Sequence, residues 1–164
     1  MSRAFVKETD GSVPLPDRPI SPHRNLVTRR GLQLIEERIA RYAGELARAT
    51  AAADREAIGR ASRELRYWTA RLGTAEVIEP GPEVERVVFG TTVTVLRADG
   101  TEATFRIVGE DEADPAAGSI AWTAPVAQAL LGSEPGDVRE LPTGAAEVLT
   151  VGAAPEPRSD AEEP

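Results

Sequence analysis

Residues 28–75, TRRGLQLIEERIARYAGELARATAAADREAIGRASRELRYWTARLGTA, decide the fold, because their apolar side chains follow one regular spacing. Apolar or small residues recur at alternating steps of three and four, which is the a and d spacing of a coiled coil. They form two runs: Leu32, Ile35, Ile39, Tyr42, Leu46, Ala49, and then Ile58, Ala61, Leu65, Trp68, Leu72, Ala75. The runs are mirror images about residues 53–54, so folding the chain back there pairs them. The stretch therefore predicts an antiparallel coiled-coil helical hairpin, with Thr28 and Asp54 as the N-caps of its helices.

The second half of the chain has the pattern of β-strands. From Val84 the residues are β-branched and largely alternating, and Asp99-Gly100 separates two such runs as a hairpin turn. Pro125 opens a short apolar helix, and two last strands meet at Thr143-Gly144. The pattern predicts an antiparallel sheet with one packed helix, and hence an α+β chain of two modules.

The module boundaries follow changes in composition. Residues 1–25 contain four prolines and few apolar side chains, which predicts a disordered proline-rich arm. The hairpin then occupies residues 26–78 and the sheet module residues 79–152. Residues 153–164 are acidic and contain proline, so we expect a disordered tail.

Composition narrows the possible functions. The 164 residues include no cysteine, which excludes disulfides, zinc–thiolate sites and cysteine nucleophiles. The one histidine, His23, excludes histidine metal cages, and we expect it to be an ordinary surface residue. Residues 1–81 carry a net charge of +3 and residues 82–164 one of −11, so the acidic half would repel free nucleic acid. The sequence shows neither a secretory signal nor a membrane-length apolar run, so we expect a cytoplasmic protein that binds no membrane.

Several motifs, in this order, resemble one known family. The blocks FGTTVTV (89–95), RIVGEDEAD (106–114) and PVAQALLG (125–132) resemble the C-terminal domain of the bacterial Gre transcript cleavage factors. The stretches LVTRRGLQLIEE (26–37) and TAEVIEP (74–80) resemble the entry to and exit from that family's hairpin. The long, irregular RIVGEDEAD block is the most specific part. In total the resemblance runs from about Leu26 to Val151.

The resemblance implies an FKBP-like C-terminal domain that docks on the rim of the secondary channel of RNA polymerase, and a coiled-coil hairpin that enters this channel. In the family, acidic residues at the hairpin tip help to hold a second Mg²⁺ in the polymerase's own active site, where the ion activates water to cut backtracked RNA. The chain would then need no cofactor of its own. It would at most stimulate cleavage by the polymerase, and would meet RNA and DNA only within the elongation complex, as a monomer.

The site residues that the resemblance implies lie in two places. The rim contact falls at Trp122, Thr123, Ala124 and Pro125, and the tip acids are Asp54 and Glu56. The basic residues near the tip, which would steer it toward phosphates or form a solvated helix face, are Arg55, Arg60 and Arg63. The acids of residues 110–114 would meet basic residues of the rim or solvate a loop.

The tip departs from the family's pattern. The family carries an Asp-x-x-Glu pair on a hairpin several turns longer, whereas Asp54 and Glu56 have Asp-x-Glu spacing. Each missing turn shortens the reach by about 5.4 Å, so the tip would stop short of the catalytic metal. The alternative roles of the two acids are an N-cap and a favourable first-turn charge.

We therefore expect a factor that occupies the channel without efficient cleavage, similar to Rnk-type regulators. A true cleavage factor that rescues backtracked complexes through its tip acids is the first alternative. The second is an FKBP-like prolyl isomerase, which needs an apolar, aromatic-lined pocket in a module whose aromatic residues are Phe89, Phe105 and Trp122. The third is an interaction module for another partner.

Overall fold

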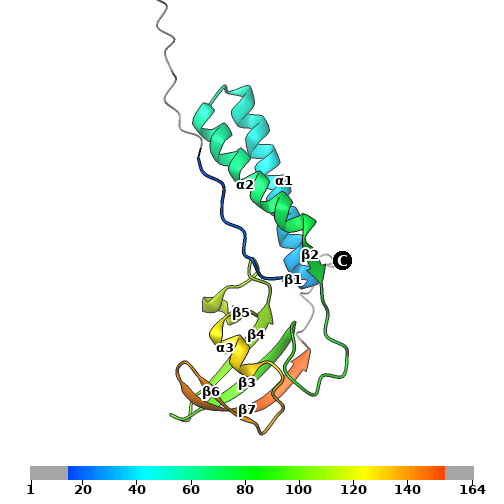
Figure 1. Ribbon diagram of the computed structural model, residues 1–164, viewed down its shortest axis with the longest axis vertical. Helices are drawn as coiled ribbons and strands as arrows, with labels where there is room; N and C mark the ends of the chain where they lie inside the picture. The colour runs from blue at the N-terminus through cyan, green and yellow to red at the C-terminus, as the bar shows by residue number, and fades with distance from the viewer. Residues whose placement is uncertain (1–14, 154–164) are drawn as a thin grey trace, which may run out of the picture.

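The protein is a helical prong mounted on a small curled sheet (Figure 1). The computed structural model describes residues 15–153. Helix α1 (Arg29–Ala51) and helix α2 (Arg55–Gly73) run antiparallel, which confirms the predicted hairpin. Both predicted caps are present: the Thr28 hydroxyl oxygen accepts from the Gly31 amide, and the Asp54 carboxylate accepts from the Ala57 amide. At 1.5 Å per residue α1 is about 35 Å long. Within residues 15–153, no helix is long and apolar enough to cross a membrane.

The tip of the prong is closed by its own backbone. The amide of Asp54 donates to the carbonyl of Ala49 at 3.0 Å, and the amide of Ala53 donates to that of Thr50 at 3.1 Å. These two bonds form a Schellman motif, which places the residue after the cap in the left-handed region. That residue is Ala53, with φ of +53°, at a position where glycine is usual.

Predicted seam residues are buried along the prong, from Ile35 and Trp68 in its lower part to Ala49 and Ala61 near the tip. Ile35 of α1 and Trp68 of α2 are buried together, and Val27 lies beneath them. Leu72, which the spacing also places in the seam, remains 38% exposed, whereas its neighbour Arg71 is 2% exposed. At the base of α2, the buried face is therefore the one that carries Arg71, and the seam position Leu72 lies at the surface.

A two-stranded sheet closes the base of the prong. Strand β1 (Asn25–Val27) leads into α1, strand β2 (Ala75–Val77) leaves α2, and the two pair in parallel. The side-chain amide of Asn25 also donates to the carbonyl of Arg71 at 2.7 Å. Figure 1 labels both strands, between the helices and the larger sheet.

The larger sheet has five strands in the order β5-β4-β3-β7-β6. In chain order, the elements of the sheet module, including its 3₁₀ turn and its helix, are β3 (Thr91–Arg97), β4 (Glu102–Val108), the 3₁₀ turn η1 (Pro115–Ala117), β5 (Ser119–Ala121), helix α3 (Pro125–Leu130), β6 (Val138–Leu141) and β7 (Gly144–Ala153). The α+β class and the short helix are confirmed. The expectation of a purely antiparallel sheet is wrong at one edge, because β5 returns through η1 and pairs in parallel with β4.

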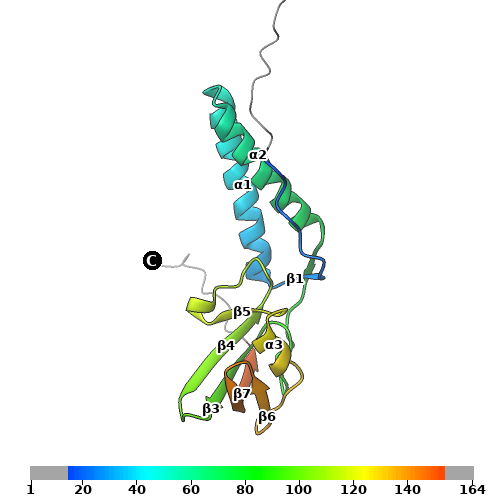
Figure 2. The ribbon, with the colours of Figure 1, turned by 60° about the vertical axis from the view of Figure 1, so that its left-hand side comes forward.

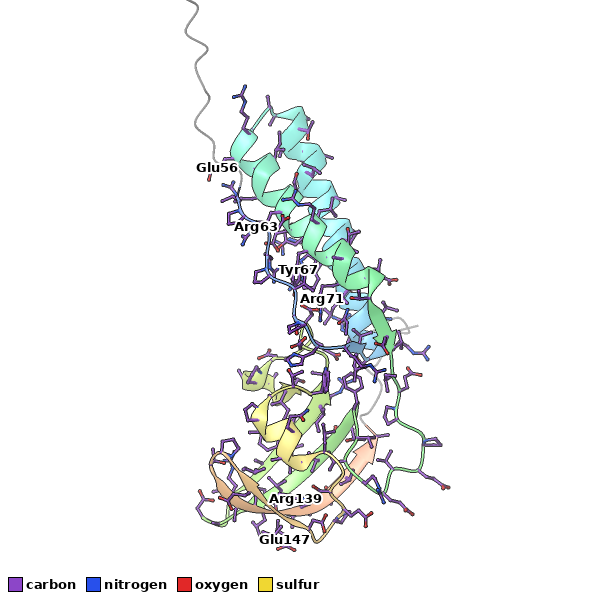
Figure 3. All side chains as sticks on the ribbon, viewed as in Figure 1. Glu56, Arg63, Tyr67, Arg71, Arg139 and Glu147 are labelled. Atoms are coloured by element: carbon purple, nitrogen blue, oxygen red, sulfur yellow. The ribbon has the colours of Figure 1, made fainter. Side chains whose placement is uncertain are left out.

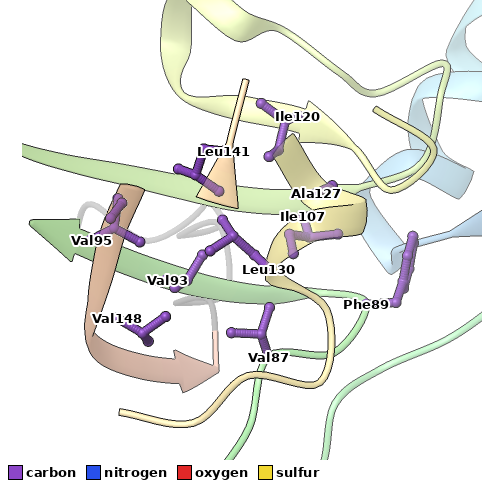
Figure 4. Packing of buried hydrophobic residues seen from close by; sticks show 11 residues of the cluster. Val87, Phe89, Val93, Val95, Ile107, Ile120, Ala127, Leu130, Leu141 and Val148 are labelled. Atoms are coloured by element: carbon purple, nitrogen blue, oxygen red, sulfur yellow. The ribbon is translucent and has the colours of Figure 1, made fainter. Parts of the chain in front are cut away.

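The core of the sheet module lies between α3 and the concave face of the sheet. Val93, Val95, Ile107 and Val148 point from the strands toward Leu130 of α3 (Figure 4). Each of these five side chains is fully buried. This core holds α3 against the sheet and thereby fixes the turn before α3, which carries the predicted rim residues.

Over the part that the structure describes, the proline-rich segment lies along the hairpin. Residues 15–24 are extended and run alongside α2 before entering β1, as both ribbon views show (Figures 1 and 2). Their prolines prevent a helix, and their polar groups bond to α2 instead. The expected disorder of residues 1–14 and of the tail lies outside the described residues, except that Ala153 ends β7.

Candidate functional site

The two tip acids, Asp54 and Glu56, are two residues apart in sequence and have different partners. One carboxylate oxygen of Asp54 accepts from the Ala57 amide at 3.0 Å and caps α2. The carboxylate of Glu56 is 83% exposed and pairs with Arg60 one turn along α2. Among residues 15–153, no cluster of three or more acidic or histidine side chains could hold a metal ion. The tip therefore offers at most two carboxylates, both with local partners.

The basic residues near the tip flank a groove between the helices. A groove of about 640 Å³ is lined from both helices by Arg48, Arg60 and Arg63, among others. Arg55 lies exposed in the first turn of α2. Arg63 is directed to the proline-rich segment, where its Nε donates to the carbonyl of Pro16 at 2.6 Å (Figure 3). The three predicted arginines therefore lie near the tip, and both Arg60 and Arg63 bond to groups of the chain itself.

The predicted rim residues form one tight turn between β5 and α3. The amide of Ala124 donates to the carbonyl of Ala121 at 2.9 Å, and Pro125 takes the first position of α3. The carbonyl of Trp122 accepts from the side chain of Gln128 at 2.6 Å. The indole of Trp122 is half-buried against the core and meets the ring of His23 edge-on at 6.1 Å between centroids. Both roles considered for Trp122, core packing and surface contact, are therefore compatible with its position.

The acids of the turn after β4 form a joint between the hairpin and the sheet module. We call this turn, residues 109–112, the acidic turn. Asp111 accepts from Nε of Arg71 at 2.5 Å and from the hydroxyl of Tyr67 at 2.7 Å. The Arg71 and Asp111 side chains are only 2% and 11% exposed. Burial, and secondly the hydrogen bond to Asp111, raise the pKa of Tyr67 to about 12.

Two further contacts complete the joint on the side of α1. Glu112 accepts from the hydroxyl of Thr28 at 2.5 Å, so the residue that caps α1 also binds the sheet module. Gly109 lies so close to β1 that a Cβ there would come within 2.5 Å of the carbonyl oxygen of Leu26. The backbone of the acidic turn therefore contacts the base of the prong directly.

The joint includes residues that the sequence pattern did not single out. Tyr67 and Arg71 lie just beside the seam positions, so the spacing gives them no inward role. His23 is exposed, as expected of a surface residue, and its ring also contacts Trp122, with Nδ1 3.5 Å from Glu110. The acidic turn was expected to solvate a loop or meet a partner, whereas three of its acids bind the chain itself.

The structure thus defines the class: a two-module α+β protein with an antiparallel helical hairpin and a mixed, curled sheet that carries one short helix. The profile of the family "Transcription elongation factor, GreA/GreB, C-term" matches residues 82–152. The transcription elongation factor GreA of Desulfovibrio desulfuricans is 42% identical over 119 residues, which cover 69% of this chain and 72% of that protein. The chain belongs to the GreA/GreB family of transcription elongation factors.

Other relatives match over a shorter length. The transcription elongation factor GreB of Neisseria meningitidis serogroup A is 41% identical over 90 residues, which cover 52% of this chain and 55% of that protein. The chain thus spans about half the length of this relative. Among solved structures, the GreA factor homolog 1 (Gfh1) protein of Thermus thermophilus is 21% identical, with a TM-score of 0.37 over 80% of this chain and 100% of that one.

Proposed function

We propose that the protein binds RNA polymerase, inserts its hairpin into the secondary channel and regulates elongation without efficient transcript cleavage. The membership of the GreA/GreB family supports the partner and the channel. The turn of residues 122–125 is the surface for the rim of the channel. The protein is then an accessory factor of the polymerase rather than an enzyme.

The observation that carries the non-cleaving mechanism is the engagement of the tip acids. A carboxylate that caps a helix has one oxygen directed at a backbone amide, and Asp54 is held in this way at 3.0 Å. Glu56 is neutralised by Arg60 on the same helix face. A metal–oxygen distance in a carboxylate site tolerates an error of only about 0.2 Å. Asp54 and Glu56 already bond to groups of their own helix and sit on a short prong, so they are poorly placed to share a Mg²⁺ with the polymerase.

A transcript-cleavage assay on backtracked elongation complexes tests this mechanism. The protein is expected to leave the RNA length unchanged and to slow cleavage stimulated by a competent factor, since both would occupy one channel. Asp54→Asn is the informative variant, because asparagine keeps the N-cap but removes the charge. Equal behaviour of Asp54→Asn and the parent protein is expected. Strong RNA shortening that Asp54→Asn abolishes would establish a true cleavage factor and refute the proposal.

The partner itself is tested separately, by titrating core polymerase with the full chain. Saturable binding is expected, and its absence would overturn the whole proposal. Prolyl isomerase activity is the alternative from another class, and the sheet module does not favour it. The hollow of about 210 Å³ on this module is lined by Leu96, Val138 and their neighbours, with no aromatic side chain among the lining residues.

A further inference from the structure

The extended segment before β1 contacts both modules. Residues 16–23 are called the strap here. Its upper end lies on α2, and its lower end lies on the acidic turn and the Trp122 indole. Figures 1 and 2 show this segment passing along α2 to the level of the sheet module. The hairpin and the sheet module are therefore linked by the strap as well as by the joint.

The upper end of the strap is tied to α2 by three neighbouring residues. Arg63 donates to the carbonyl of Pro16, and Arg66 donates to Asp17 through both Nε and Nη2 at 2.8 and 2.6 Å. Arg18 pairs with Glu64 at 2.6 Å. Pro16, Asp17 and Arg18 thus each contact a residue of α2 with complementary polarity or charge, and all three partners lie between Arg63 and Arg66.

Arg18 also connects the strap to the joint. Its guanidinium lies over the ring of Tyr67, 3.7 Å from the centroid, in cation–π geometry. The hydroxyl of the same tyrosine donates to Asp111 of the acidic turn. A strap residue thus fixes the ring whose other end holds the sheet module.

The lower end of the strap is tied to the sheet module. Ser21 donates to the Glu110 carboxylate at 3.0 Å, the same oxygen that accepts from Thr123 at 3.3 Å. His23 lies 3.5 Å from that carboxylate and packs edge-on against Trp122. Both ends of the strap are therefore anchored, and the joint lies between them.

We propose that the strap sets the angle between the hairpin and the sheet module. Because the strap crosses the joint and is tied on both sides, bending the prong away from it requires one set of ties to break. The joint alone leaves this direction of bending to a few contacts at the bases of α1 and α2. The inference concerns the shape of the free protein and does not depend on its binding to polymerase.

The distance between spin labels in the two modules tests this proposal. The chain has no cysteine, so Ala47→Cys on the exposed face of α1 and Val138→Cys, where the valine is 66% exposed, take one label each without background. Double electron–electron resonance then reports the distribution of distances between prong and sheet. The parent protein is expected to give one narrow peak.

Cutting either end of the strap is expected to broaden this peak. Asp17→Ala with Arg18→Ala loosens the upper end, where only the bond from Arg63 to the Pro16 carbonyl then remains, and Ser21→Ala with His23→Ala releases the lower end. Each pair should raise the population outside the main peak roughly two- to fivefold, the change that loss of partly exposed ion pairs and hydrogen bonds produces in an equilibrium. Circular dichroism should show unchanged helix content.

Combining the two cuts distinguishes a strap from two independent contacts. A strap restrains bending only while both of its ends are attached, so cutting the second end has no further effect once the first is cut. All four substitutions together should therefore broaden the distance peak no more than either pair does. The matched control is Arg24→Ala, which removes an arginine of the same segment whose ion pair with Glu76 stays within the base of the prong. An unchanged peak in the cut variants, additive broadening, or equal broadening by Arg24→Ala would overturn the proposal. Arg18→Ala alone provides a milder variant with the same expected direction.

Discussion

The buried ion pair of the joint gives the sharpest prediction about stability. Arg71→Met keeps the length and apolar packing of the side chain but removes the charge that faces Asp111 at 2.5 Å. Removing one partner of a buried pair costs about 3–5 kcal/mol, because the other charge stays desolvated. Asp111 is 11% exposed and keeps the hydroxyl of Tyr67, so we expect the lower end of this range, about 3 kcal/mol.

The measurement is thermal unfolding followed by calorimetry. For a chain of this size about 3 kcal/mol corresponds to a fall in Tm of roughly 6–12 °C. Because the pair joins two modules, the variant should also show separate transitions for the hairpin and the sheet, where the parent protein shows one. Arg24→Ala removes an equally short but exposed pair and should leave the Tm unchanged.

A double-mutant cycle identifies the interaction itself. Asp111→Asn keeps an acceptor for Tyr67 and removes only the charge, and Arg71→Met with Asp111→Asn removes both charges of the pair. A coupling energy of about 1–3 kcal/mol is expected between two residues in such contact. Single effects below about 1 kcal/mol that simply add would refute the reasoning that the joint depends on this pair.

Three further predictions follow from single positions. Ala53→Gly should raise the stability by about 0.5–1 kcal/mol in urea unfolding, since the left-handed φ of +53° strains alanine more than glycine; a loss of stability would contradict the assigned turn. Gly109→Ala should lower the free energy of unfolding by about 1–3 kcal/mol, because the new Cβ would meet the carbonyl oxygen of Leu26. Gly59→Ala, inside α2, adds a Cβ in open space and should raise the free energy of unfolding by up to about 1 kcal/mol. A change of the same sign at both positions would be inconsistent with the close approach at Gly109. The pKa of Tyr67 is raised to about 12, so its hydroxyl ionises at lower pH in the unfolded chain than in the folded one. The stability that Tyr67 contributes should therefore be complete below pH 10 and be lost as the pH rises toward 12. Unfolding curves measured over this pH range should lose the alkaline decline in Tyr67→Phe, and an unchanged decline would refute the assignment.

The hairpin was predictable because its determinants are local. The steps of three and four between apolar side chains, the caps at Thr28 and Asp54 and the turn near residue 53 all act within a few residues of sequence. The same holds for the hairpin of β3 and β4 at Asp99-Gly100. Local patterns of this kind report secondary structure and the face that it buries.

The joint and the strap could not be predicted, because they depend on pairs that are distant in sequence. Arg71 and Asp111 are forty residues apart, and neither position looks unusual in a charged helix or an acidic loop. Only the docking of the two modules turns the base of α2 toward the acidic turn, which buries Arg71 and leaves Leu72 exposed. The parallel pairing of β5 escaped prediction for the same reason, since strand direction depends on the return through η1.

The functional roles of the candidate site residues stay predictions. The structure places Asp54 and Glu56 at the tip of the hairpin, and residues 122–125 in the turn that leads into α3. Their partners came only from the structure: the amide of Ala57 for Asp54, Arg60 for Glu56, and the edge-on ring of His23 for Trp122. A charge pattern alone does not show which carboxylates are already engaged.

The backbone bonds that close the tip have a consequence for the order of assembly during synthesis. They join residues at most five apart, so the prong can form from its end downward as soon as α2 has left the ribosome. The acidic turn leaves the ribosome some forty residues after Arg71, which until then lacks its partner Asp111. The prong is thus made first as an independent rod, and its orientation is set last, when the sheet closes.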